Sequence, residues 1–183
     1  MKDERKGVKG GVSGLILVYT GNGKGKTTAS LGLCMRALGH NQSVGFLQFM
    51  KGSKNYGEVK LASVLPNFTL VQSGQESFVS YENPDPIDIQ MAQDGLKLAQ
   101  RWLEEDKFDL VVLDELLVAV AFKLISVDQV LDLIKKRPLH LNLVLTGRYA
   151  APEIMEIADT ITEMTEQRHA YHRGVEAKAG MEF

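Results

Sequence analysis

The chain has 183 residues, of which 44% are hydrophobic and 24% are charged, a composition typical of globular domains. Its formal net charge of −2 argues against a general affinity for nucleic acid, and its single cysteine, Cys34, excludes an internal disulfide and a cysteine-rich zinc site. No apolar stretch is long enough for a membrane span or a signal peptide, so we expect a cytoplasmic protein with no membrane partner.

The first 14 residues are polar, basic and rich in glycine, and we expect them to form a flexible N-terminal arm. A short apolar run over 15–20 follows and predicts a strand that is covered on both faces. After a glycine-dense loop, the pattern over 26–38 predicts a helix, with Gly39 as the C′ glycine just beyond its end. We expect residues 15–183 to fold as a single domain.

The loop between this strand and helix has the composition of a phosphate-binding loop. It reads Gly21-Asn22-Gly23-Lys24-Gly25-Lys26-Thr27-Thr28. Glycines let backbone N–H groups surround an anion, and the helix that follows directs its unpaired N–H groups at the same phosphates. Lys26 supplies a full positive charge, and the hydroxyl of Thr27 is suited to bind Mg²⁺.

The loop departs from the usual phosphate-loop pattern in its length. Only three residues separate Gly21 from Gly25, whereas the usual pattern has four residues in that interval. Lys24 adds a second cation in the middle of the shortened loop. We therefore expect it to hold a triphosphate differently from the loop of an ordinary ATPase or kinase.

The remainder of the chain alternates between strand-like and helix-like segments. Strands are predicted over 43–49, 67–72, 108–113, 141–146 and 159–164, and helices over 56–65, from Asp85 or Asp88 through Leu103, from Ser126 to Pro138, and over 152–158. Such alternation is typical of an α/β domain with a mainly parallel sheet and helices on both faces.

In such a sheet, ligands bind outside the carboxyl ends of the strands. Three of these ends carry polar groups, namely the loop at 21–28, Asp114 with Glu115, and Gly147 with Arg148. An apolar strand that ends in two acids is the expected partner of a phosphate loop. One carboxylate binds Mg²⁺, and the other supports it or acts as a base.

Other polar residues have competing interpretations. Arg148 is placed to neutralise phosphate charge, but a salt bridge explains it equally well. Arg36, on the first helix, is favoured as a solvated side chain. His169 and His172 lie three residues apart, but no neighbouring acid or cysteine cluster supports a metal pair. The residues alone indicate a Mg–nucleoside triphosphate enzyme, without naming its acceptor.

Beyond the loop, nearly the whole chain resembles the phosphate-loop type of cobalamin (corrinoid) adenosyltransferase family. The similar segments are 19–29, 36–40, 45–52, 113–116, 137–138, 145–148, 151–153, 158–164, 169–171 and 174–183. The shortened loop, the Thr-Gly-Arg segment and the final segment together are far more specific than a phosphate loop alone.

The resemblance implies a three-layer P-loop NTPase-like (RecA-like) fold. It also implies transfer of the 5′-deoxyadenosyl group of ATP to the Co(I) centre of a corrinoid, with release of tripolyphosphate, in adenosylcobalamin synthesis or salvage. A flavodoxin-like electron donor and a homodimer follow from the same resemblance. The alternatives are a nucleotide or small-molecule kinase, an NTPase, and a non-enzymatic module that binds ATP as a switch.

The resemblance also assigns roles to individual residues. ATP would be bound by Gly21, Asn22, Gly23, Lys24, Gly25, Lys26, Thr27, Thr28 and Arg36. Mg²⁺ would be bound by Thr27 and Glu115, to which the strand-end pattern adds Asp114, and the catalytic residues would be Lys26, Arg148 and Phe78.

Phe78 belongs to one of two segments where the chain departs from the family, the other being the more apolar segment 116–125. The family often has a Phe-Thr-Trp-like segment, in which two aromatic side chains lie on the corrin face and displace the lower ligand of cobalt. Here the segment reads Phe78-Val79-Ser80, followed by Tyr81. Phe78 therefore matches the first aromatic, whereas the second is replaced by Ser80 or supplied by Tyr81.

Overall fold

The computed structural model describes residues 13–183, so the predicted arm lies almost entirely outside the described residues. Its strands form one six-stranded sheet in the order β3-β2-β4-β5-β1-β6, in which every neighbouring pair is parallel. The strands are β1 (Ile16–Thr20), β2 (Val44–Phe49), β3 (Phe68–Ser73), β4 (Leu110–Asp114), β5 (Asn142–Thr146) and β6 (Thr160–Glu163).

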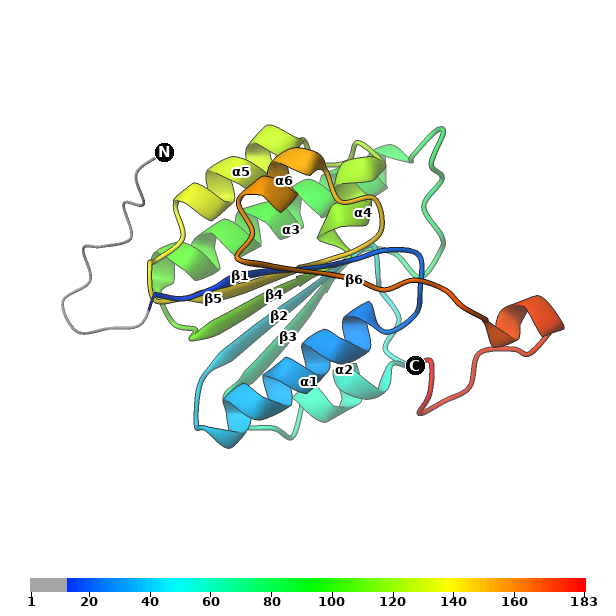
Figure 1. The fold of residues 1–183 in the computed structure, drawn as a ribbon, viewed down its shortest axis with the longest axis horizontal. Helices are drawn as coiled ribbons and strands as arrows, with labels where there is room; N and C mark the ends of the chain where they lie inside the picture. The colour runs from blue at the N-terminus through cyan, green and yellow to red at the C-terminus, as the bar shows by residue number, and fades with distance from the viewer. Residues whose placement is uncertain (1–12) are drawn as a thin grey trace.

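Helices cover both faces of the sheet, which confirms the predicted three-layer α/β fold (Figure 1). The helices α1 and α2 lie on one face, and α3, α4, α5 and α6 lie on the other. Their bounds are α1 (Lys26–Gly39), α2 (Gly57–Ala62), α3 (Pro86–Glu105), α4 (Leu116–Ala121), α5 (Val127–Lys135) and α6 (Pro152–Glu156), and a 3₁₀ turn, η2 (Ala170–Arg173), follows β6.

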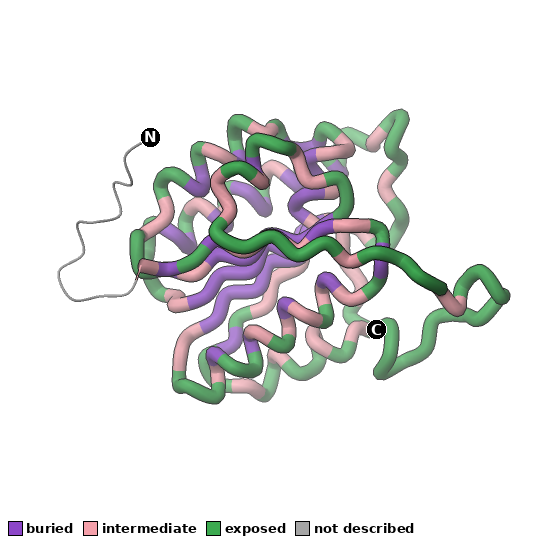
Figure 2. The backbone as a smooth tube through the Cα atoms, in the orientation of Figure 1, coloured by how far each residue is buried: buried purple, intermediate pink, exposed green. Residues whose placement is uncertain are grey.

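The alternation of side chains along the strands divides the core into two halves. In β4, Val111 and Leu113 belong to the apolar cluster beneath α3, α4, α5 and α6. Leu110 and Val112 belong to the cluster beneath α1. Because both faces are covered, the central strands are largely apolar, with buried polar residues such as Gln48 and Asp114 near their carboxyl ends. Figure 2 shows these strands buried, while β6 is exposed at the edge.

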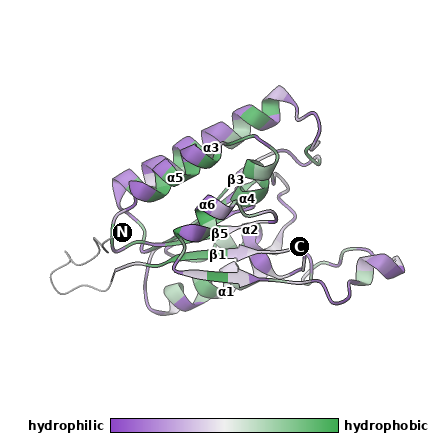
Figure 3. Ribbon diagram, turned by 45° about the horizontal axis from the view of Figure 1, so that its top comes forward, coloured by the Kyte–Doolittle hydropathy of each residue, from purple (hydrophilic) through white to green (hydrophobic). Residues whose placement is uncertain are grey.

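The longest helix packs through the face that its sequence pattern predicts. Along α3, Ala92, Leu96 and Ala99 are buried, and Trp102 stacks edge-on against Phe108 with ring centroids 5.0 Å apart. Trp102 is therefore a packing residue of the core. Figure 3 shows that hydrophobic and hydrophilic residues alternate along α3, as an amphipathic helix requires.

The predicted helix start at Ser126 is confirmed in detail. The backbone N–H of Gln129 donates to the Ser126 hydroxyl over 3.2 Å, and the N–H of Ser126 donates to the Gln129 side chain over 2.9 Å. This reciprocal pair is a capping box. The predicted start near Asp85 is also correct, since Asp85 is the N-cap residue and Pro86 the first residue of α3.

Two local predictions are wrong. Gly39 is the last residue of α1 rather than a left-handed residue beyond it, and Asn41, with φ of 58°, makes the left-handed turn instead. The segment after Glu115 contains a helix, α4, that the sequence did not predict. Its run of apolar residues lacks a polar face because Leu116, Leu117 and Val120 are buried.

None of the helices in the described part of the chain is long and apolar enough to cross a membrane. The parallel arrangement brings the carboxyl ends of all strands to one edge of the sheet. The segment after β6 runs away from the sheet and then returns towards that same edge (Figure 1). The site described next lies there.

Candidate active site

The phosphate loop is a tight turn that requires glycine at several positions. Gly21 and Gly25 have φ of 93° and 118°, which favours glycine over other residues. A Cβ added at Gly21 would lie 2.4 Å from the carbonyl oxygen of Met164. The N–H of Gly23 donates to that same carbonyl over 2.6 Å, so the loop packs against the chain that leaves β6.

Lys26 begins α1, and its side chain folds back over the loop. Its ammonium donates to the carbonyl oxygens of Gly21 and Gly23, each over 2.7 Å. Burial lowers the pKa of Lys26, Glu115 opposes this shift, and the nearby charge of Arg148 lowers the pKa further. Lys26 is therefore a cation held in a confined space, directly above the loop that would receive a phosphate.

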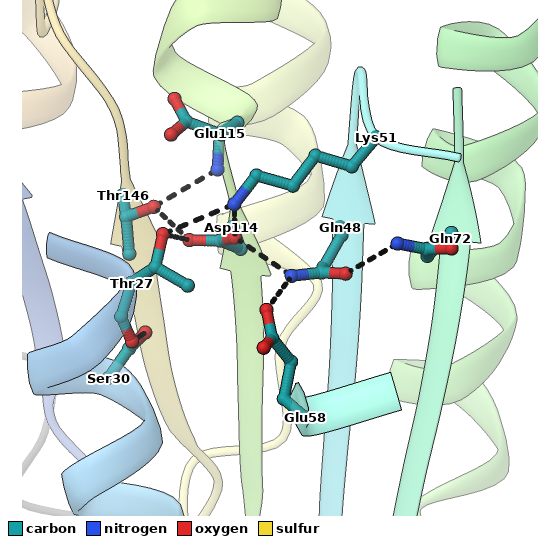
Figure 4. Close-up of polar contacts among 9 residues, drawn as sticks. All are labelled: Thr27, Ser30, Gln48, Lys51, Glu58, Gln72, Asp114, Glu115 and Thr146. Carbon is teal, nitrogen blue, oxygen red and sulfur yellow. Dashed lines mark hydrogen bonds and ion pairs between the residues drawn. The ribbon is translucent and has the colours of Figure 1, made fainter. Parts of the chain in front are cut away.

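Asp114, at the end of β4, is completely buried and fully hydrogen-bonded (Figure 4). Its Oδ1 accepts from the hydroxyls of Thr27, over 3.0 Å, and Thr146, over 2.7 Å. Its Oδ2 accepts from the ammonium of Lys51 over 2.9 Å. Because Thr27 donates its proton to Asp114, its oxygen lone pairs are directed elsewhere and suit a metal ion.

Glu115 adopts a left-handed conformation, with φ of 59°, that separates its side chain from that of Asp114. Its N–H donates to the hydroxyl of Thr146 over 3.0 Å. Among the described residues, no hydrogen bond reaches the carboxylate of Glu115, which lines the cavity described below. Burial raises the pKa of Glu115, the charge of Asp114 raises it further, and Lys51 opposes both effects.

These groups surround a cavity of about 430 Å³. Its wall includes the loop from Asn22 to Thr28, Glu115 and Arg148, which come from the ends of three different strands. The convergence of these strand ends, which we predicted from topology, is confirmed. The cavity therefore combines backbone N–H groups, several cations and one free carboxylate.

Lys24 lies at the outer side of the cavity, in contact with the end of the chain. Its ammonium donates to the carbonyl oxygen of Met181 over 2.9 Å and forms an ion pair with Glu182. Gly180 and Phe183 also line the cavity. The segment after η2 thus forms one wall of the site.

Four of the predicted residues do not line this cavity. Gly21 and Asp114 are hydrogen-bonded to the lining residues Lys26 and Thr27, whereas Arg36 and Phe78 lie elsewhere. Arg36 lies on α1, ten residues beyond Lys26, and lines a separate cavity of about 240 Å³ together with His40. Phe78 lies in the loop between β3 and α3, and its side chain is fully exposed. In that loop, Tyr81 packs edge-on against Phe122, with ring centroids 5.0 Å apart.

Several residues of the site were not predicted as site residues. Lys51, Tyr56 and Glu58 line the cavity from the β2 side, and His169 lines it from the segment after β6. Lys51 lies two residues after the end of β2, so the rule that ligands bind at the carboxyl ends of strands could have found it. Nothing in the sequence pattern signals the wall formed by 180–183.

The residues present fit a magnesium ion. Among the described residues, no cluster of three histidine, cysteine or acidic side chains could hold a metal alone. Mg²⁺ is usually bound by one or two carboxylates together with substrate phosphates. The hydroxyl of Thr27 and the carboxylate of Glu115 provide such hard oxygen ligands, with Asp114 behind them.

Comparison with known proteins agrees with this site. Residues 12–183 match the family described as ATP:corrinoid adenosyltransferase BtuR/CobO/CobP. A corrinoid adenosyltransferase of Pseudomonas aeruginosa is 39% identical over 93% of this chain and 84% of its own length. Those of Escherichia coli and Salmonella typhimurium are each 35% identical over 93% of this chain and 86% of theirs. The chain therefore belongs to the ATP:corrinoid adenosyltransferase family.

Proposed function

We propose that this protein transfers the 5′-deoxyadenosyl group of ATP to the Co(I) centre of a corrinoid and releases tripolyphosphate. The observation that carries the proposal is the cavity at the strand ends. There, a phosphate loop one residue shorter than usual faces Glu115 and Arg148 in a chain of this family. The product would serve adenosylcobalamin synthesis or salvage.

In this reaction, the electron pair of Co(I) attacks the ribose C5′ of ATP. The Co–C bond forms as the C5′–O bond breaks, and the electron pair of that bond leaves with the tripolyphosphate. No phosphoryl group moves and no water is activated. The protein must therefore hold ATP in position and stabilise the negative charge that develops on the leaving group.

The cations around the cavity suit this task. Lys26 and Lys24 lie on the loop itself, and Arg148 lies at the end of β5. We propose that these three side chains, together with the loop N–H groups, hold the triphosphate and stabilise it as it leaves. A bound Mg²⁺ ion would neutralise further phosphate charge, with Thr27 and Glu115 as its ligands and Asp114 fixing the hydroxyl of Thr27.

We propose that the loop between β3 and α3 faces the corrinoid. Phe78 is a fully exposed aromatic side chain, which would bury a large apolar surface against a corrin ring. Ser80 cannot supply a second aromatic, and Tyr81 is packed on Phe122. A corrinoid that lacks a lower ligand would place the least demand on this loop.

The family resemblance extends the proposal to partners. We propose a homodimer in the cytoplasm that receives its corrinoid reduced by a flavodoxin-like donor. ATP contact by Arg36 also belongs here. Measuring the Mg-ATP affinity of Arg36→Ala tests that role, because an unchanged affinity would remove Arg36 from the nucleotide site.

The reaction is tested by mixing the protein anaerobically with Mg-ATP and a chemically reduced Co(I) corrinoid. We expect the visible spectrum of a light-sensitive Co–C product and an equal amount of tripolyphosphate. Lys26→Ala should lower the rate at least 100-fold, by analogy with the loss of other electrostatic transition-state contacts. Formation of ADP or free phosphate without a Co–C product would instead establish a kinase or an NTPase.

A further inference from the structure

Lys51 is the cation of the site that neither the sequence motifs nor the proposed function assigns. It lies two residues beyond the end of β2, and Met50 between them has a φ of 56°, which turns the chain sharply towards the cavity that Lys51 lines. A Cβ added at Gly74 would lie 2.4 Å from the backbone nitrogen of Lys51, so the loops after β2 and β3 pack closely. The base of the Lys51 side chain is thus fixed.

The ammonium of Lys51 lies among the oxygen atoms that would surround a magnesium ion (Figure 4). It donates to Oδ2 of Asp114 over 2.9 Å and to the hydroxyl of Thr27 over 3.3 Å. On its other side, it lies 5.8 Å from the ring centroid of Tyr56. Burial alone would lower the pKa of Lys51, but Asp114 and Glu115 raise it overall, so this ammonium is a stable charge.

The geometry creates a competition for the oxygen of Thr27. The hydroxyl proton is donated to Asp114, and Lys51 donates to one of the two remaining lone pairs, so its ammonium crowds the oxygen that a metal ion would use. A divalent cation there would also repel the ammonium at close range. The ammonium must then move away from Thr27, and the cavity that Lys51 lines is the space in which the phosphates would lie.

We propose that Lys51 is a further positioning residue for the triphosphate, which rests on the proposed function. Without nucleotide, Lys51 holds the position between Thr27 and Asp114. When Mg²⁺ and a triphosphate bind, Lys51 releases Thr27 to the metal and pairs with a phosphate oxygen. Removing its charge should therefore have opposite effects on the binding of a metal ion alone and on the binding of a metal–triphosphate complex.

The test measures how tightly each variant binds two different ligands. Mn²⁺ alone, a paramagnetic probe for Mg²⁺, is titrated by electron spin resonance, and Mg-tripolyphosphate is titrated by calorimetry. For Lys51→Met we expect Mn²⁺ to bind severalfold more tightly, because its competitor is gone. Mg-tripolyphosphate should bind about 10- to 100-fold more weakly, because one charge-assisted hydrogen bond is lost. Lys51→Arg should restore tripolyphosphate binding to within severalfold.

Lys54→Met is the matched control, since Lys54 is exposed in the same loop and the change in net charge is identical. It should alter neither affinity by more than about twofold, consistent with a screened surface charge. If Lys51→Met does not fold, Lys51→Gln keeps a hydrogen-bond donor for Asp114 and should show the same two opposite effects.

The proposal is overturned if Lys51→Met and Lys51→Gln weaken the binding of both ligands, change the binding of neither, or match the Lys54 control. A merely structural residue would weaken both, because the whole site would be disturbed. Neither titration contains a corrinoid or adenosine. Failure of adenosyl transfer would therefore appear only in the corrinoid assay, and these titrations would still decide the role of Lys51.

Discussion

Two adjacent acids at the end of β4 do different work because their surroundings differ. Asp114 is enclosed by donors from Thr27, Thr146 and Lys51, so it acts as a fixed acceptor. Glu115 turns into the cavity, and no hydrogen bond within the described chain reaches its carboxylate. The sequence predicted both as metal residues but could not rank them, since the left-handed turn at Glu115 is visible only in the fold.

From the raised pKa of Glu115 we predict how the stability of the fold depends on pH. A carboxyl whose pKa is higher in the folded state than in the unfolded state stabilises the fold at low pH, and this stabilisation is lost as the pH rises through the folded pKa. In the absence of metal and nucleotide, Glu115→Gln should therefore raise the melting temperature at pH 7, by about 2–4 °C for each kcal/mol of stability gained. The gain should shrink as the pH is lowered towards 4.5, the ordinary value for this carboxyl.

The measurement is a thermal melt of both proteins across that pH range, with Mn²⁺ affinity measured in parallel. The stabilised variant should bind Mn²⁺ at least tenfold more weakly, since a metal ligand is gone. Glu153→Gln, on the exposed side of α6, is the control and should change neither quantity. An unchanged pH profile in Glu115→Gln would contradict the assigned environment of Glu115.

Cys34 gives a second prediction at this scale. It is buried in α1, and burial raises the pKa of its thiol to about 12. At pH 8, only about one molecule in ten thousand would then carry the reactive thiolate. A chromogenic disulfide reagent should label the native protein at least 100-fold more slowly than the protein in denaturant. Rapid labelling of the native protein would show that α1 opens locally.

At the scale of elements, the sequence predicted most of the fold. All six strands were found with their ends displaced by no more than about two residues, because their apolar runs are separated by glycine, proline and polar segments. The helix α4 was missed because the run from Leu116 onward is buried on all sides and therefore has no helical period. The wall formed by 180–183 was missed because it depends on how a long irregular segment returns to the sheet.

Close approach between α3 and the sheet can be tested at Gly95. A Cβ added there would lie 2.7 Å from the hydroxyl of Ser73 and 2.9 Å from Cε1 of Phe49. Gly95→Ala should therefore lower the free energy of unfolding by about 1–3 kcal/mol, the usual cost of overpacking. Gly32→Ala is the matched control, because no atom lies within 4 Å of the added Cβ. It should raise stability by about 0.5–1 kcal/mol in a helix interior.

Chemical denaturation of the two variants and the parent protein measures both changes. Opposite signs for Gly95→Ala and Gly32→Ala are expected. Equal effects would mean that α3 does not pack on β2 and β3 as closely as described.

At the scale of the whole molecule, residues 180–183 return to the phosphate loop and line its cavity. Glu182 forms an ion pair with Lys24, so its carboxylate neutralises one of the positive charges of the loop. Glu182→Gln removes a negative charge beside the triphosphate and should tighten tripolyphosphate binding severalfold in a calorimetric titration, more at low salt than at high salt. Glu176→Gln, in the exposed part of the same segment, should have no effect. Weaker binding by Glu182→Gln would mean that Glu182 supports the bound phosphate.

Adenosyl transfer requires above all that the triphosphate leaves ATP as one intact unit. The direct measurement replaces ATP with β,γ-methylene-ATP, in which the γ-phosphoryl group cannot be transferred, and follows its Mg complex with a reduced Co(I) corrinoid. We predict a light-sensitive Co–C product and an equal amount of the intact methylene tripolyphosphate in the phosphorus resonance spectrum, because only the C5′–O bond breaks. If ATP were consumed to ADP or phosphate while the analogue gave no Co–C product, the adenosyl transfer assigned to this protein would be contradicted.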